Sequence, residues 1–199
     1  MGSDPAPFIS NLFLYVYENR FSTNLKKSDL PRARKFRHVF RFIDDLIALN
    51  DDDEFWKSHN ANEIYPSQME LKLENKNNKS ATFYDLDLEI ADQVFHIKLY
   101  DKRDAFTFSV VRMPYKCSSM PYKMFYATIS AEILRICRAT SEYKYFLDSV
   151  QKLIIRMRKQ GAKSLGIRRI VTKMMGRHGS NFHKFRIPAE VIALDVSSF

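Results

Sequence analysis

Apolar residues recur every three or four positions after residue 120, and this spacing predicts three helices. The positions that mark them are Tyr122, Phe125, Ile129, Ile133 and Ile136, then Phe146, Val150, Leu153, Ile154 and Met157, then Leu165, Ile170, Val171 and Met174. Gly161 is expected to end the second helix, while Ser164 and Gly176 are expected to cap and end the third. An earlier helix is predicted over residues 7–20, and because it is apolar nearly all round, we expect it to be packed on most sides.

Alternating apolar and polar positions predict an antiparallel sheet with one wet face in the middle of the chain. The alternating segments are residues 69–74, 85–90 and 95–100, with turns expected at 75–80 and 91–93. Two shorter apolar runs, 39–43 and 46–49, flank Asp44 and Asp45 and predict a buried hairpin with both acids at its tip. Residues 25–37 are expected to form a basic connector, and residues 51–56 a short helix with an acidic start.

The composition favours a folded protein over a disordered or fibrous one. Hydrophobic residues make up 45% of the 199 positions, with only 5 glycines and 7 prolines, so a sizeable core can be buried. Cys117 and Cys137 are the two cysteines, which argues for a reducing compartment or for no redox role. The sequence has no apolar run long enough to cross a bilayer and no secretory-signal layout at residues 1–5. We expect a soluble, globular, intracellular protein, nuclear or cytoplasmic, with no membrane partner and no internal repeat.

The positive charge is concentrated near the end of the sequence. The chain carries 32 Lys and Arg against 23 Asp and Glu, a formal net charge of +9. Residues 151–187 contain no acid and these basic residues: Lys152, Arg156, Arg158, Lys159, Lys163, Arg168, Arg169, Lys173, Arg177, Lys184 and Arg186. A cationic lobe on an otherwise neutral chain is typical of a surface that lies along a nucleic-acid phosphate backbone. The alternative is a solvated helix face that happens to be basic.

The adjacent acids Asp44 and Asp45 are the first candidates for catalytic chemistry. Like charges on a rigid turn repel one another, and a bound divalent cation such as Mg²⁺ relieves that repulsion because it prefers carboxylate oxygens. Two such ions can activate the attacking oxygen and stabilise the leaving group of a phosphoryl transfer. The alternative is a plain, solvated Asp-Asp turn, because a two-residue motif is weak on its own.

Four segments in order carry a resemblance to a known family. Residues 42–45, Phe-Ile-Asp-Asp between apolar strands, resemble the aromatic-x-Asp-Asp signature of reverse transcriptases, and residues 1–12 resemble the Gly-x-x-x-Ser-Pro-x-x-x-Asn-Leu segment that precedes it in the family. Residues 83–88 resemble the family's Phe-Leu-Asp-Leu strand, and residues 99–103 its Tyr-x-Lys block. The combination is most similar to retroelement reverse transcriptases of the Penelope-like kind. The resemblance is strongest over residues 1–104 and becomes weaker, though continuous, to about residue 178.

The resemblance implies an α+β fold, with a partial polymerase palm (antiparallel sheet with a helix) followed by a helical thumb. Residues 1–104 would be the C-terminal part of the palm, 105–178 a basic, thumb-like helical region, and 179–199 a tail. The implied function is RNA-directed DNA polymerase, a nucleotidyltransferase of a retrotransposable element. Its partners would be an RNA template, a DNA primer and deoxynucleotides, with Mg²⁺ or Mn²⁺ as cofactor and an endonuclease domain encoded elsewhere.

The resemblance also implies roles for individual residues. Asp44 would be the main ligand shared by the catalytic metals, and Asp45 its weaker partner. The pocket for the incoming nucleotide and template would include Gly2, Pro7, Asn11 and Phe42, and the primer grip would include Lys102 and Arg103. The residues expected on the nucleic-acid backbone are Arg156, Lys159, Lys163, Arg168 and Arg169.

The sequence also departs from the family pattern. Phe42 stands where tyrosine is commoner, and Ala6 stands where the family has serine. The family's other metal-binding aspartate lies on a strand before the glycine segment with which this sequence begins. We therefore expect this polypeptide to be inactive alone, as a truncated gene model or a decayed element copy. The alternatives are a non-catalytic nucleic-acid-binding remnant, a DNA-templated polymerase, or a structural remnant with no affinity for nucleic acid.

Overall fold

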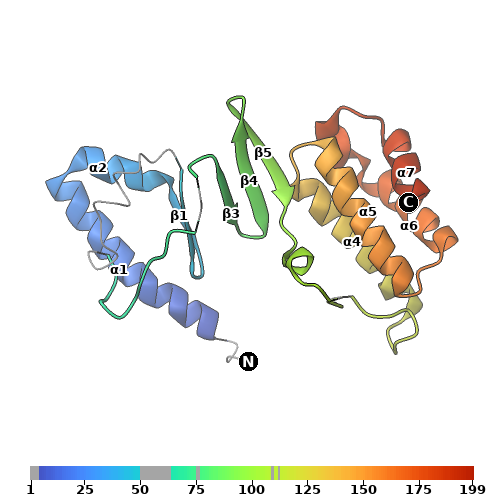
Figure 1. The fold of residues 1–199 in the computed structure, drawn as a ribbon, viewed down its shortest axis with the longest axis horizontal. Helices are drawn as coiled ribbons and strands as arrows, with labels where there is room; N and C mark the ends of the chain where they lie inside the picture. The colour runs from blue at the N-terminus through green and yellow to red at the C-terminus, as the bar shows by residue number, and fades with distance from the viewer. Residues whose placement is uncertain (1–4, 50–63, 75–76, 109, 112) are drawn as a thin grey trace. The chain divides into compact units, whose positions relative to one another are not determined.

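The computed structural model describes residues 5–49, 64–74, 77–108, 110–111 and 113–199, and its fold is of mixed α+β type, as expected (Figure 1). The chain divides into two compact units, Met1–Lys76 and Asn77–Phe199. The boundaries at residues 104 and 178 rested on the family resemblance, and they stay a prediction. No helix within the described residues combines the length and the apolar character needed to span a membrane.

The first unit begins with two helices, α1 (Ala6–Ser28) and α2 (Leu30–Lys35). Asp29 separates them, because its side chain accepts a hydrogen bond from the Arg32 backbone at 3.0 Å and so caps the start of α2. A short 3₁₀ turn, η1 (Phe36–His38), follows. The expected connector over residues 25–37 is therefore wrong, because this stretch is helical for most of its length.

The first helix was expected to be packed on most sides, but much of the apolar surface of α1 is exposed. Leu14 and Leu25 are buried, but Phe8 is 71% exposed, and Ile9 and Leu12 are also exposed. Among the described residues, α1 thus contributes to the core of its unit through a narrow side only.

A hairpin of β1 (Val39–Phe42) and β2 (Asp45–Ala48) follows η1 in the first unit. The strands pair from Val39 with Ala48 to Phe42 with Asp45, which leaves Ile43 and Asp44 as the two turn residues. The expectation that both acids lie in the turn is wrong by one position, because Asp45 is the first residue of β2. The hairpin is also half-buried instead of buried.

The second unit starts with an antiparallel sheet in the order β3 (Ser80–Phe83), β4 (Leu86–Ala91), β5 (Val94–Leu99). The two turns are Tyr84-Asp85 and Asp92-Gln93, and all four residues have a left-handed backbone, the geometry of tight hairpins. The strands expected over 85–90 and 95–100 are confirmed. Residues 69–74 form no strand, so that prediction is wrong. The strand that pairs with the first edge of β4 is instead β3, whose first residue, Ser80, lies where a turn was expected.

Four α-helices follow the sheet among the described residues of the second unit: α4 (Tyr122–Ala139), α5 (Tyr143–Lys159), α6 (Ser164–His178) and α7 (Ala189–Ser198). Figure 1 shows them side by side, with the 3₁₀ segment η4 (Gly179–Phe185) between α6 and α7. The first two predicted helices are confirmed. The third is confirmed with different ends, because Lys163 precedes it without a side-chain cap and it continues past Gly176.

The hydrophobic core of the second unit lies between these helices. The apolar side chains with at most 1% exposure are Phe125, Ile129, Ile133, Cys137, Phe146, Val150, Ile154, Met157, Val171, Phe182, Ile192 and Val196. Two of them, Ile192 and Val196, belong to α7, so part of the expected tail is a core helix. The sheet is joined to the helices because Ser141, between α4 and α5, exchanges hydrogen bonds with Ile97 of β5 at 2.8 and 2.9 Å. The short helix expected over 51–56 lies outside the described residues.

Candidate functional site: a carboxylate hairpin and a basic helical surface

The carboxylate hairpin presents its two acids to solvent. Asp44 lies in the two-residue turn and Asp45 begins β2, and both residues are exposed. Ile43, the first turn residue, has a φ of 55°, a left-handed conformation that β-branched residues rarely adopt. This conformation costs about 1–2 kcal/mol, and such strain is often found at functional turns.

Arg41 fixes this turn to α1. Its Nε donates a hydrogen bond to Glu18 Oε1 at 2.6 Å, and its Nη1 donates to Asn11 Oδ1 at 2.7 Å and to the Ile43 carbonyl at 3.0 Å. The Tyr65 hydroxyl donates to the same Glu18 oxygen at 2.7 Å. Burial, reinforced by the Glu18 contact, raises the pKa of Tyr65 well above its usual range, so its proton stays in place. One guanidinium therefore joins the helix to the residue that precedes Asp44.

The residues predicted for the nucleotide and template pocket differ in how they are linked to the hairpin. Asn11 is joined to the hairpin through Arg41, whereas Pro7 lies in the first turn of α1. Phe42 ends β1 directly opposite Asp45. Gly2 lies outside the described residues.

The donor set of the hairpin fits a magnesium or manganese ion only in part. Asp44 and Asp45 supply the oxygen ligands that such ions prefer, and Mg²⁺ in nucleotide sites is often held by one or two carboxylates together with substrate phosphates. Among the residues that the structure describes, no group of three or more His, Cys, Asp or Glu side chains could hold a metal ion. The pair can thus bind an ion jointly with phosphates, but it is not a complete protein site.

Several predicted nucleic-acid contacts are engaged inside the second unit. Arg103, in η3 (Lys102–Ala105), binds Asp101 through Nε at 2.7 Å and Nη2 at 2.8 Å. Arg156 of α5 binds Asp101 as well, and it also binds Asp104 at 2.7 Å. Lys152 binds Asp104 at 2.5 Å. These ion pairs offset the charges of Arg103 and Arg156, so both side chains first of all join η3 to α5.

The other cations of the basic region are different. Apart from Lys152 and Arg156, no basic residue of segment 151–187 forms an ion pair with a carboxylate in the described part of the chain. Four of them, Lys159, Lys163, Arg168 and Arg169, are predicted contacts and are exposed, as is Lys102 of the expected primer grip. On α6, Arg169 also starts a series of cations at four-residue spacing, with Lys173 and Arg177, that shares one helix face.

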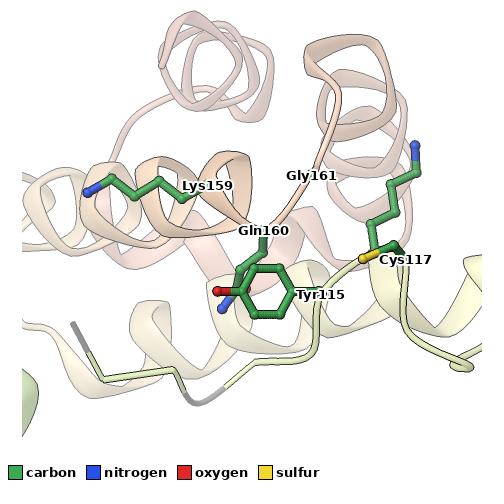
Figure 2. Close-up of a pocket in the computed structure, with 6 residues that line it drawn as sticks. Tyr115, Cys117, Lys159, Gln160 and Gly161 are labelled. Carbon is green, nitrogen blue, oxygen red and sulfur yellow. The ribbon is translucent and has the colours of Figure 1, made fainter.

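A hollow of about 420 Å³ opens at the end of α5 (Figure 2). Its lining residues are Tyr115, Lys116, Cys117, Lys159, Gln160 and Gly161. Among them, the sequence predicted a binding role for Lys159 alone, although it carried a signal for Tyr115 and Lys116. Met-Pro-Tyr-Lys occurs twice, at 113–116 and 120–123, so the expectation of no internal repeat is wrong on this short scale.

Comparisons with protein-family models, with curated proteins and with solved structures found no match for this chain.

Proposed function

We propose that this chain is a palm-and-thumb fragment of a retroelement reverse transcriptase, an RNA-directed DNA polymerase. The observation that carries the proposal is the two-residue turn that exposes Asp44, with Asp45 next to it at the start of β2. The order and type of the surrounding motifs support it, as do the cations of segment 151–187 that form no ion pair with a described carboxylate, such as Lys163 and Arg168. The partners proposed are an RNA template, a DNA primer and deoxynucleotides.

Each part of the chain has a distinct task in this proposal. Asp44 and Asp45 would hold Mg²⁺ or Mn²⁺, which supplies charge neutralisation at the phosphates during nucleotidyl transfer. Arg41 holds the turn in one conformation through its bonds to Glu18 and Ile43, so the carboxylates need little reorganisation when substrate binds. Exposed cations such as Lys163 and Arg168 would bind the phosphate backbone and position the duplex.

The test measures binding of a primer–template to the purified chain by fluorescence anisotropy, with deoxynucleotide present, in Mg²⁺ and in a chelator. We expect Mg²⁺ to tighten binding, and Asp44→Asn to remove this gain, about ten-fold or more, because a charge-assisted interaction is lost. The matched control is Asp92→Asn, which changes a carboxylate in the turn between β4 and β5 and should leave the Mg²⁺ effect intact. Equal Mg²⁺ effects in wild type and Asp44→Asn would contradict the metal role of the hairpin.

We expect no primer extension by this polypeptide alone. Two carboxylates without a third in the described residues hold catalytic ions poorly. Extension of a primed RNA template by wild type, and its loss in Asp44→Asn, would overturn this expectation while supporting the proposed enzyme class.

The alternative function is a non-catalytic nucleic-acid-binding remnant. It is favoured by the cations of segment 151–187 that have no ion-pair partner among the described residues, since they can bind phosphates without any contribution from the hairpin. Primer–template binding that depends strongly on salt but is unchanged in Asp44→Ala would select this alternative.

A further inference from the structure

We propose that the two Met-Pro-Tyr-Lys segments, residues 113–116 and 120–123, form a stacking site for unpaired bases of a single-stranded nucleic acid. This inference rests on the proposed function, because it names the part of a bound strand that this region would take.

The two tyrosines of the repeat expose their rings. Tyr115 is 47% exposed, and Tyr122, at the start of α4, is 59% exposed. Lys116 links them, since it follows Tyr115 in the chain while its Nζ lies 5.4 Å from the centre of the Tyr122 ring. Exposed aromatic rings next to cations are the usual platform on which proteins stack unpaired bases, because every base has a flat face and every nucleotide a phosphate.

The loop that carries Tyr115 is held on both sides by Gln160. The Lys116 backbone donates a hydrogen bond to the Gln160 carbonyl at 2.9 Å, and Gln160 Nε2 donates to the Met113 carbonyl at 3.0 Å. Gly161 has a φ of 96°, and a Cβ atom there would lie 3.3 Å from Lys116 Cβ, so the two segments run close together. The backbone on both sides of Tyr115 is therefore held before any ligand binds, which lowers the entropy cost of ordering this loop around a base.

A polar atom at this place lacks a partner. Gln160 is 8% exposed, and its Oε1 is buried without a hydrogen-bond donor in the described structure. Gln160 and Tyr115 line the same hollow, and Figure 2 shows the Tyr115 ring in front of the Gln160 side chain. An unpaired buried acceptor is costly, and in this proposal the amino or imino N–H of a stacked base would supply the missing donor once the side chain turns Oε1 toward the hollow.

Charge around the hollow suits a nucleotide and not a neutral ring alone. Lys116 and Lys159 line it, and neither forms an ion pair with a described carboxylate. Arg169 is close enough to Tyr122 to act against the rise in its pKa that the hydrogen bond with Tyr126 causes. A phosphate on either side of a stacked base would thus meet a cation.

The experiment compares two labelled ligands on the full chain by fluorescence anisotropy: a single-stranded oligonucleotide of mixed sequence and a blunt duplex. Tyr115→Leu and Tyr122→Leu keep apolar bulk but remove the stacking ring. Each is expected to weaken single-strand binding about five-fold or more and to leave duplex binding within about two-fold, because stacking needs an unpaired base. Tyr115→Phe should bind the single strand like wild type, because the ring face remains.

Phe95→Leu is the matched control, since Phe95 of β5 is 49% exposed, close to the value for Tyr115, and lies outside the hollow. The Phe95→Leu variant should bind the single strand and the duplex with the same affinities as wild type. Single-strand binding that survives both tyrosine changes, with duplex binding present, overturns the stacking site and leaves the proposed function standing. If the wild-type protein binds neither the single strand nor the duplex, both the proposed function and the stacking site are rejected.

Discussion

At the residue scale, Gly166 sets the distance between α4 and α6. A Cβ atom at Gly166 would lie 2.4 Å from the hydroxyl oxygen of Tyr126, and about as close to its ring carbons. Tyr126 is buried, and its hydroxyl accepts a hydrogen bond from the Lys163 backbone at 3.1 Å, so the ring is held in place. The missing side chain of Gly166 is what allows this aromatic ring to lie against the first turns of α6.

Gly166→Ala is therefore expected to destabilise the second unit. Overpacking of this kind costs about 1–3 kcal/mol, which exceeds the gain of up to about 1 kcal/mol in helix propensity. Urea denaturation followed by circular dichroism measures the free energy of unfolding. Gly176→Ala is the control in the same helix, where a Cβ atom would meet nothing within 4 Å, so this change should stabilise the unit by up to about 1 kcal/mol. Two changes of the same sign would contradict the close approach at Gly166.

At the element scale, Asp101 is the centre of the ion pairs that join η3 to α5. Burial alone raises the pKa of Asp101, but hydrogen bonds from Arg103 and Arg156 outweigh it and hold the pKa well below its ordinary value. The carboxyl group thus has a lower pKa in the folded chain than in the unfolded one. Its stabilisation is complete above the unfolded pKa of about 4 and is lost as the pH falls below that value.

Asp101→Asn tests this acid dependence. The variant should have a lower melting temperature than wild type at pH 7, because a charge-assisted hydrogen bond contributes about 1–3 kcal/mol. The difference should shrink as the pH falls from 4 to 2, since wild type then loses the same contribution. Thermal melts across this pH range measure both effects, and Asp92→Asn, at an exposed turn, should follow wild type throughout. A constant difference between Asp101→Asn and wild type would show that the carboxylate charge is not responsible.

Regular elements with an uncontested pattern could be predicted from the sequence. The stripe of Phe125, Ile129 and Ile133 has a single way to be buried. The alternation over 85–90 and 95–100 predicted the position of β4 and β5, but not a single wet face, because Ile90 and Phe95 on the expected apolar side are exposed. Residues 69–74 alternate equally well but are not paired, because a strand also needs a neighbour. α7 was missed since it spans ten residues and buries only Ile192 and Val196, too few to establish a period.

The candidate site was predictable only where its residues are adjacent in the chain. Asp44 and Asp45 were visible as a pair, but which of them lies in the turn depends on the pairing of Phe42 with Asp45. The role of Arg41 could not be predicted, because its partner Glu18 is 23 residues away and the Tyr65 that completes the contact is 47 residues from Glu18. Such contacts are decided by packing and not by local sequence.

At the scale of the whole molecule, the two compact units should differ in independence. The large core lies within residues 113–196, and the sheet that packs beside it begins at Ser80, so the second unit contains its own core. A fragment of residues 77–199 is expected to fold alone, with helical circular dichroism and one cooperative melting transition within a few degrees of the matching transition in the full chain. An unfolded fragment, seen as poor amide dispersion in NMR spectra, would show that residues 1–76 are required for its stability.

The burial of Ile192 and Val196 also has a consequence during translation. These two side chains are at most 1% exposed and close a core that begins as far back as Met113. Until the ribosome has added them and they have left the exit tunnel, α4, α5 and α6 carry an apolar surface without its cover. We expect the nascent second unit to stay accessible to chaperones and proteases until α7 has emerged and packed onto the other helices.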